Sequence, residues 1–195
     1  MPELDKILDI STNLEHRFIP DQGILQRVVE VLRSQKKKIV LTQGVYDLIH
    51  EGHALYLEKA RSHGDVLIVG IDSDEFTRQR KGPNRPIVPQ SERIKMLVHL
   101  RHVDIVTVRE SHHGIGDLIR MVKPDILITS SSTSDFTQDM KKEYGDFCGD
   151  IITLPPQATT STTARIRNLT IEGAENLARE IKTLTDNFLE KIRKI

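Results

Sequence analysis

Short apolar segments alternate with amphipathic segments along most of the chain. Residues 66–71 form a nearly unbroken apolar run, which is typical of a strand buried on both faces of a parallel sheet. Residues 24–32 instead place apolar side chains three and four positions apart, which predicts a helix with one buried face. The same reasoning predicts strands at 39–41, 66–71, 103–108, 125–129 and 151–154, and helices at 21–38, 51–63, 73–79, 90–100, 115–122 and 135–144.

This alternation predicts an α/β fold: a Rossmann-like, doubly wound, five-stranded parallel sheet with helices on both faces. We expect an N-terminal helical extension over 1–38, a central domain over 39–170, and a long amphipathic helix over 171–195. The apolar stripe of that last helix is expected to pack either on its own domain or on a second subunit of a homodimer. Ligands of such sheets bind at the carboxyl ends of the strands, so the site is expected there.

Charge and cysteine content narrow the range of functions. The 28 basic and 28 acidic residues leave no net charge, which argues against a broad electrostatic grip on nucleic acid. Cys148 is the only cysteine, which excludes a disulfide framework and a cysteine-based zinc site. The polar N-terminal residues do not resemble a secretory signal, and no apolar run approaches the length of a membrane span. We therefore expect a cytoplasmic protein with no nucleic-acid or membrane partner.

The stretch from Gln43 to His53 carries the strongest chemical signal. A strand that ends at Gly44 and is followed by a helix leaves free backbone N–H groups at the turn, and the helix dipole adds positive charge. Phosphate sites are built in this way. His50 and His53 stand one turn apart at the start of the helix, with Gly52 between them. Their spacing does not match a zinc-protease motif, so we interpret them as donors to phosphate oxygens, with simple helix capping as the alternative.

Two further motifs follow along the chain. The segment from Arg80 to Pro89, which includes Lys81, is rich in Lys, Arg, Gly and Pro and is expected to be a mobile, positively charged lid. Arg93 falls on the next predicted helix, where we expect it to be a fixed phosphate clamp. Asp47 is interpreted either as a residue that orients the turn or a histidine, or as a turn-former alone.

Residues 159–163 form a run of Ser and Thr between the fifth predicted strand and a helix. Hydroxyl groups at a helix N-terminus cap the helix and also bind phosphate. Capping needs one such residue, whereas this run supplies five, so a phosphate-binding role is favoured.

These motifs resemble those of the cytidylyltransferase-like nucleotidyltransferases, and the likeness covers residues 39–169. The stretch from Gly44 to His53 resembles the family's Gly-x-Phe-Asp-x-x-His-x-Gly-His signature, with Tyr46 in the place of Phe. The nearest likeness is to the adenylyltransferase domain of bacterial ADP-heptose synthase. The family's Lys-Gly-x-x-Arg-Pro stretch, helix arginine and Ser-Thr-Thr turn are matched by Lys81, Gly82, Arg85, Pro86, Arg93, Ser161, Thr162 and Thr163.

The resemblance implies an enzyme in which the phosphate of a small acceptor attacks the α-phosphorus of a nucleoside triphosphate and pyrophosphate leaves. It implies that His50, His53 and Lys81 are catalytic, and that Mg²⁺ enters on the triphosphate without a protein ligand. It favours ATP and a sugar 1-phosphate of the heptose-phosphate type. The nucleotide-binding residues that it implies are Gly44, Val45, Tyr46, Asp47, Gly52, Arg93, Ser161, Thr162 and Thr163.

Three alternatives stay open from the sequence. The first is a CTP-dependent enzyme acting on glycerol phosphate, ethanolamine phosphate or a related alcohol phosphate. The second is a nucleotide-binding protein without turnover, and the third is a fragment of a class I aminoacyl-tRNA synthetase, for which the chain is short and lacks the expected basic loop. The choice of base is open because residues 129–135 read Thr-Ser-Ser-Ser-Thr-Ser-Asp, where the family often carries a Gly-Asp stretch.

Overall fold

The computed structural model describes residues 14–131, 138–158 and 162–193, the side chains of 138, 162–168 and 186–193 excepted. The chain divides into two compact units at residue 159. The first unit contains the sheet and its flanking helices, and the second contains the helix α9, which spans Thr162–Arg193.

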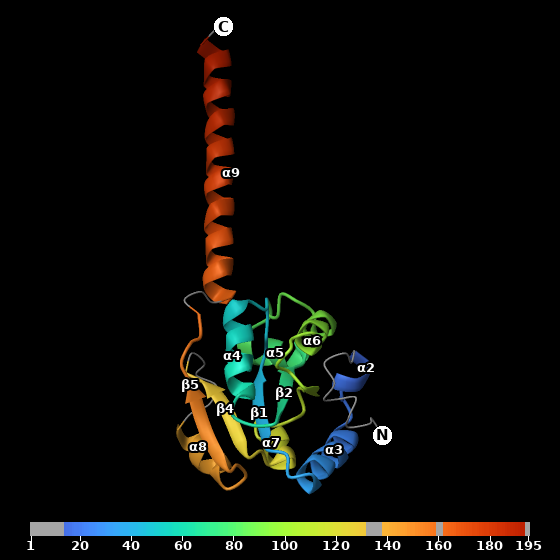
Figure 1. The fold of residues 1–195 in the computed structure, drawn as a ribbon. Coiled ribbons are helices and arrows are strands. Elements are labelled where there is room, and N and C mark those ends of the chain that lie inside the picture. Colours follow the sequence, from blue (N-terminus) through green and yellow to red (C-terminus); the bar gives the residue numbers. More distant parts are fainter. Residues whose placement is uncertain (1–13, 132–137, 159–161, 194–195) are drawn as a thin grey trace. The chain divides into compact units, whose positions relative to one another are not determined.

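Five parallel strands form the sheet, which confirms the predicted fold class. Their spatial order is β3-β2-β1-β4-β5, so the direction of winding reverses between β1 and β4 (Figure 1). The carboxyl end of β1 therefore lies at the switch point, where ligands of such sheets bind. The strands are β1 (Ile39–Gly44), β2 (Val66–Asp72), β3 (Ile105–Arg109), β4 (Ile126–Ser130) and β5 (Asp150–Leu154).

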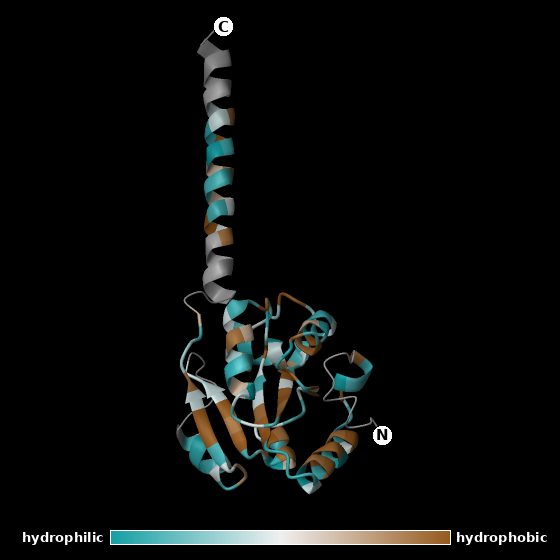
Figure 2. Cartoon of the chain, in the orientation of Figure 1, coloured by the Kyte–Doolittle hydropathy of each residue, from teal (hydrophilic) through white to brown (hydrophobic). Residues whose placement is uncertain are grey.

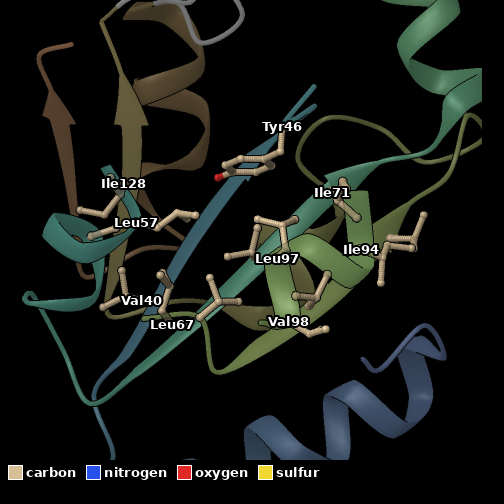
Figure 3. Close-up of a cluster of buried hydrophobic side chains, with 14 of the residues drawn as sticks. Val40, Tyr46, Leu57, Leu67, Ile71, Ile94, Leu97, Val98 and Ile128 are labelled. Carbon is tan, nitrogen blue, oxygen red and sulfur yellow. The ribbon is translucent and has the colours of Figure 1, made fainter. Parts of the chain in front are cut away.

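Helices cover both faces of the sheet and enclose two apolar clusters. On one face α4 and α6 contribute Leu57 and Leu97 to a cluster that also includes the Tyr46 ring (Figure 3). On the other face α3, α7 and α8 pack against Leu41 and its neighbours. The buried strands are correspondingly apolar, as the brown central strands in Figure 2 show. The helices of the first unit are α2 (Leu14–Arg17), α3 (Gln22–Ser34), α4 (Glu51–Arg61), α5 (Asp74–Lys81), α6 (Gln90–Val98), α7 (Asp117–Val122) and α8 (Gln138–Gly145).

Helix α3 belongs to the core of the first unit. Asp21 caps it, because its carboxylate accepts a hydrogen bond from the Ile24 N–H at 2.8 Å. Leu25 and Leu32 are fully buried in the cluster beneath. The segment expected as an N-terminal extension thus supplies one of the layers that cover the sheet, in the same compact unit.

Several element boundaries differ from those predicted, and two of them fall in motifs that the sequence singled out. Helix α5 continues through Lys81 instead of ending at residue 79, because Ser73 caps its start and Gly82 ends it with φ 95°. Helix α9 begins at Thr162 instead of at residue 171. The Ser/Thr run reads as a turn in the sequence, but hydroxyl residues are equally suited to the first turn of a helix. No helix in the described ranges is long and apolar enough to span a membrane.

Candidate active site

The turn between β1 and α4, which we call the histidine turn (residues 44–53), has an unusual backbone. Tyr46 and Leu48 adopt φ values of 53° and 48°, in the left-handed region that side chains other than glycine seldom occupy. Conformations of this kind cost free energy and persist where the surrounding structure imposes them, often at functional sites. The Tyr46 ring folds back over Gly44, where an added Cβ would stand 3.2 Å from it. The absence of a side chain at Gly44 therefore gives the ring room at the end of β1.

The two histidines of this turn are held in one tautomer by the backbone. The Gly52 N–H donates to Nδ1 of His50 at 3.0 Å, and the His50 N–H donates to Nδ1 of His53 at 3.4 Å. Because a backbone N–H can only donate, both Nδ1 atoms must be unprotonated. Each neutral ring therefore carries its proton on Nε2. The histidines cap α4 and at the same time bring two Nε2–H donors to the N-terminus of that helix.

His53 is neutral at physiological pH. Burial, the neighbouring His50 and the charge of Lys81 lower the pKa of His53 to about 4, against an opposing effect of Asp47. Its ring centre lies 4.2 Å from that of His50 and 5.7 Å from that of Tyr46. This ring is thus a fixed, uncharged hydrogen-bond donor, which suits stabilisation of charge that develops on a phosphate oxygen.

Gly52 is required by close packing inside the turn. A Cβ at this position would stand 2.9 Å from Cε1 of His50 and 3.0 Å from the Cβ of Ala158. The chain that follows β5 therefore passes directly against the histidine turn. Ser161 itself lies outside the described residues, and so do the side chains of Thr162 and Thr163, so their predicted role in phosphate binding stays a prediction.

Lys81 is an exposed cation whose charge reaches the histidine turn. It is the last residue of α5, and its charge is one of the causes of the lowered pKa of His53. Lys81 therefore lies within electrostatic range of His53, from which it is far apart in the sequence. Its predicted contact with a bound phosphate remains a proposal.

Asp47 holds the chain that follows α5. Its carboxylate accepts hydrogen bonds from the N–H groups of Ile87 and Val88 and pairs with Arg85 at 2.8 Å. Burial would raise the pKa of Asp47, but these donors outweigh it and keep that pKa below its ordinary value. The distal half of the lid expected to be mobile is therefore tied to the histidine turn.

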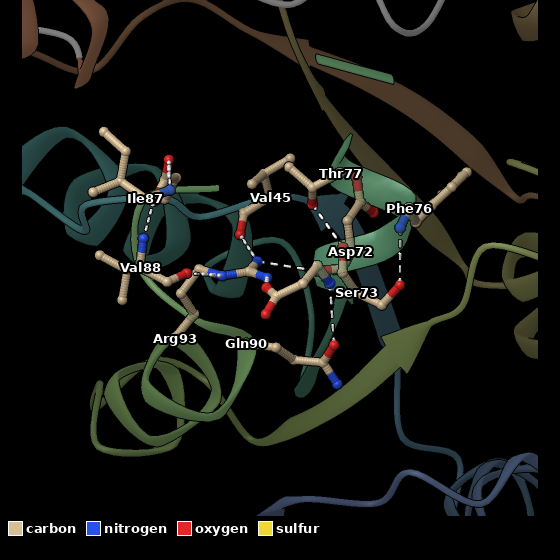
Figure 4. A network of polar contacts seen from close by, with 11 residues as sticks. Val45, Asp72, Ser73, Phe76, Thr77, Ile87, Val88, Gln90 and Arg93 are labelled. Atoms are coloured by element: carbon tan, nitrogen blue, oxygen red, sulfur yellow. Dashed lines mark hydrogen bonds and ion pairs between the residues drawn. The ribbon is translucent and has the colours of Figure 1, made fainter. Parts of the chain in front are cut away.

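Arg93, predicted to be a fixed phosphate clamp, is buried and binds protein groups in this structure, so its contact with a phosphate stays a prediction. Its side chain is 1% exposed, and its guanidinium donates to the carbonyl oxygens of Val45, Asp72 and Val88 (Figure 4). It also pairs with the Asp74 carboxylate at 2.6 Å. The physical reason is that a buried guanidinium is stable only when its donors are satisfied, and here the protein supplies the acceptors. Arg93 thus fixes the positions of the residues around it, including Val45 in the turn.

A second buried ionic cluster did not emerge from the sequence motifs. Asp72, fully buried at the end of β2, pairs with Arg109 at the end of β3 and with Arg80 of α5. The available signal was the position of Asp72 and Arg109, each the first charged residue after an apolar strand. Both positions lie at the sheet edge that carries the histidine turn.

The polar groups of the histidine turn are suited to an anion. Its two imidazole Nε2–H groups are hydrogen-bond donors at the start of a helix, where the dipole favours negative charge. The part of the chain that the structure describes contains no cluster of three or more His, Cys, Asp or Glu residues placed to hold a metal ion.

A parallel α/β sheet with a glycine–histidine turn at its switch point is an arrangement suited to binding a nucleotide. The chain belongs to the cytidylyltransferase-like family, whose sequence profile matches residues 41–168. This match runs from within β1 to the start of α9 and includes every motif discussed above.

Curated relatives are about two fifths identical to this chain over the region that aligns. It is 43% identical over 142 residues to the bifunctional protein HldE of Desulfatibacillum aliphaticivorans, an alignment that covers 73% of this chain and 29% of that protein. It is 41% identical over 128 residues to the bifunctional protein HldE of Helicobacter pylori strain G27, covering 66% of this chain and 27% of the relative. The chain thus spans less than a third of the length of these relatives.

Solved structures share the fold. A lipopolysaccharide core biosynthesis protein from Thermoplasma volcanium superimposes with a TM-score of 0.53 at 22% identity, covering 64% of this chain and 99% of that one. The pantoate-beta-alanine ligase of Francisella tularensis gives a TM-score of 0.56 at 18% identity, covering 78% of this chain and 72% of the ligase. At these identities the likeness concerns the architecture alone.

Proposed function

We propose that this protein transfers an adenylyl group from ATP to a small sugar 1-phosphate and releases pyrophosphate. An oxygen of the acceptor phosphate attacks the α-phosphorus of ATP, and the bond between that phosphorus and the bridging oxygen of the pyrophosphate breaks. The products are a nucleotide-activated sugar and pyrophosphate, so atoms and charge balance without a covalent enzyme intermediate. Such a reaction depends on positioning and on stabilisation of negative charge.

The proposal rests on one observation: the Nδ1 atoms of His50 and His53 each accept a hydrogen bond from a backbone N–H group. These bonds fix the proton of each ring on Nε2, at the N-terminus of α4, before any ligand arrives. Donors fixed in this way need little reorganisation during the reaction, which makes them effective against charge that develops in a transition state. In our proposal they bind the α-phosphate and the departing oxygen, and the helix dipole adds to their effect.

Lys81 and the backbone of the turn complete the proposed site. Lys81 bridges the phosphates of the two substrates, as its exposure and its electrostatic effect on His53 support. Gly44, Val45, Tyr46, Asp47 and Gly52 shape the nucleotide-binding turn, and Ser161, Thr162 and Thr163 bind the β- and γ-phosphates. Arg93 contributes indirectly, because its guanidinium holds the Val45 carbonyl.

Mg²⁺ accompanies the triphosphate in this proposal. Its preference for oxygen ligands and its reluctance to lose water suit a cation held by phosphate oxygens and water. The bound cation supplies neutralisation of phosphate charge, and the histidine donors and Lys81 do the positioning.

The choice of ATP and a sugar phosphate rests on likeness to the heptose enzymes. The Lys81-Gly82-x-x-Arg85-Pro86 spacing and the arginine-free approach to Ser161 are similar to theirs, and HldE proteins match the same region at about two fifths identity. A pyrophosphate-release assay tests this choice with each nucleoside triphosphate, paired with heptose 1-phosphate, other sugar 1-phosphates, glycerol phosphate and ethanolamine phosphate. We expect turnover with ATP and a sugar 1-phosphate. Turnover with CTP and an alcohol phosphate would replace these substrates, and no turnover in any pairing would contradict the proposal.

We also propose a cytoplasmic homodimer that pairs through α9. Among the described side chains of this helix, Leu177, Ile181 and Leu184 are large, apolar and exposed, and they follow the spacing of four and three that a coiled-coil seam uses. A single helix cannot bury such a stripe on itself. Light scattering should give twice the chain mass for the protein and the chain mass for Ile181→Asp. Thr183→Asp is the matched control on the same helix, and a monomeric unmutated protein would contradict the dimer.

A further inference from the structure

The buried cluster at the ends of β2 and β3 is built around a single carboxylate. One oxygen of Asp72 accepts from Nε of Arg109 at 2.9 Å and from a second nitrogen of the same guanidinium. The other oxygen accepts from Arg80 at 2.5 Å. The side chain of Asp72 is 0% exposed and that of Arg80 is 15% exposed. A buried carboxylate that binds one guanidinium on each oxygen restricts both arginines, because moving either guanidinium breaks its ion pair with that carboxylate.

The two arginines also share an aromatic partner. The guanidinium carbons of Arg80 and Arg109 lie 5.2 and 5.3 Å from the centre of the Phe76 ring. Phe76 is buried and lies on α5, one turn before Arg80. Cation–π contacts of this length add to the ion pairs and restrict the orientation of the guanidinium planes. The C-terminal turn of α5 is therefore fixed to the sheet through Arg80.

Arg80 directly precedes Lys81 at the end of this helix. Beyond Gly82 the chain is held again, where Asp47 binds Arg85 and the N–H groups of Ile87 and Val88. The exposed lysine thus stands between two points at which buried or partly buried carboxylates secure the chain. A lysine side chain has a flexible stem, so the place of its ammonium group depends on how firmly its backbone is held.

We propose that Arg80, through its ion pair with Asp72, is a positioning residue that fixes Lys81 relative to the histidine turn. Arg109 supports this arrangement, because its own ion pair with Asp72 keeps the carboxylate oriented. The inference rests on the proposed nucleotidyl transfer, in which Lys81 bridges the phosphates of the two substrates. Arg80 itself contacts no reacting atom in this scheme. Its effect on turnover therefore passes through Lys81.

A double-mutant cycle separates this role from a purely structural one. Arg80→Ala should lower kcat/KM about tenfold, and Lys81→Ala should lower it further. The double variant should match Lys81→Ala within about twofold, because a positioning residue has nothing left to position. Arg80→Lys should recover part of the loss by keeping one ion pair with Asp72. Arg78→Ala, at an exposed arginine of the same helix, is the matched control and should leave kcat/KM unchanged.

Titration of the His53 ring by NMR gives a second readout that does not depend on activity. Lys81 is among the groups that lower the pKa of His53, so this pKa reports the position of the lysine ammonium. Arg80→Ala should therefore raise the pKa of His53 in the same direction as Lys81→Ala, and Arg78→Ala should not. Because Arg109 still pairs with Asp72, Arg80→Ala is expected to fold, and Arg80→Lys serves as the test variant if it does not.

The outcomes distinguish this inference from the proposed function. Full activity of Lys81→Ala would overturn the role of the lysine, and with it the proposed function in its present form. A strong effect of Lys81→Ala together with no effect of Arg80→Ala would overturn the positioning role alone. The same holds if the loss caused by Arg80→Ala persists at full size in the Lys81→Ala background, because the arginine would then act on stability or on another group.

Discussion

The histidine turn and the Asp72 cluster stand at the same edge of the sheet but use their polar groups in opposite ways. His50 and His53 accept backbone hydrogen bonds on one side of the ring and carry a donor on the other. Arg80 and Arg109 instead direct their guanidinium groups to a carboxylate within the protein. One region is suited to present donors to a ligand, and the other fixes the frame that holds such donors. Cations near the proposed phosphate site therefore need not bind phosphate themselves.

Arg93 is a third cation that binds protein groups, and its substitution is expected to have the largest effect, which is on the free energy of unfolding. Arg93→Ala removes four hydrogen bonds and leaves three carbonyl oxygens and the Asp74 carboxylate without their donor. Breaking a buried ionic network of this kind costs about 3 kcal/mol or more of the free energy of unfolding. Urea unfolding measures it, with the exposed Arg101→Ala as control. Unchanged stability with a large rise in KM for the nucleotide would restore the phosphate clamp.

The histidine turn should respond in activity and not in stability. His50→Ala and His53→Ala are each expected to lower kcat by about 10²-fold, the scale of losing one preorganised donor to a developing charge. Steady-state pyrophosphate release gives kcat, and circular dichroism confirms folding. His102→Ala, at a half-exposed histidine near Glu58, provides the control. Single variants that retain full turnover, or that fail to fold, would assign the two rings to helix capping instead.

Limited proteolysis of the segment from Lys81 to Pro89 tests whether this segment closes over a bound nucleotide. Since Asp47 secures its distal half, nucleotide with Mg²⁺ should protect the region around Gly82 from proteolysis about tenfold while changing the Arg85–Val88 stretch little. Mass spectrometry of limited digests locates the cleavage. Asp47→Asn should weaken the tether and spread cleavage into that stretch. Equal digestion with and without nucleotide would argue against closure.

The lowered pKa of His53 makes a pH-dependent contribution to the free energy of unfolding. The folded protein holds this ring neutral down to about pH 4, whereas the unfolded chain takes up the proton near pH 6.5. The unfolded state therefore binds more protons between these values, and stability should be full above pH 6.5 and decline as the pH falls towards 4. Unfolding curves of the protein and of His53→Gln should converge in that window. A decline of equal size in both would assign the pH dependence to other groups.

The alternation of apolar and amphipathic segments determined the fold. Five apolar runs separated by helical periods leave few arrangements other than a parallel sheet covered on both faces, because each element must bury its apolar side. The same local pattern located the histidine turn, since a strand, a glycine and a helix start are adjacent in the chain. Helix lengths were less well predicted, and α5 and α9 both extended beyond their expected bounds, because caps and turns use the same residues.

Only the tertiary structure decided which charged side chains face inward. Arg93, Arg80 and Lys81 are all cations near one another in the sequence, yet the first is buried, the second is paired with Asp72, and the third is exposed. The sequence pattern does not distinguish them, because a guanidinium is buried only when distant segments bring acceptors to it. Val45 and Asp72 come from two such segments. The sequence therefore identified the candidate site residues. Which of them are exposed for binding and which support the fold depended on contacts that form only in the folded protein.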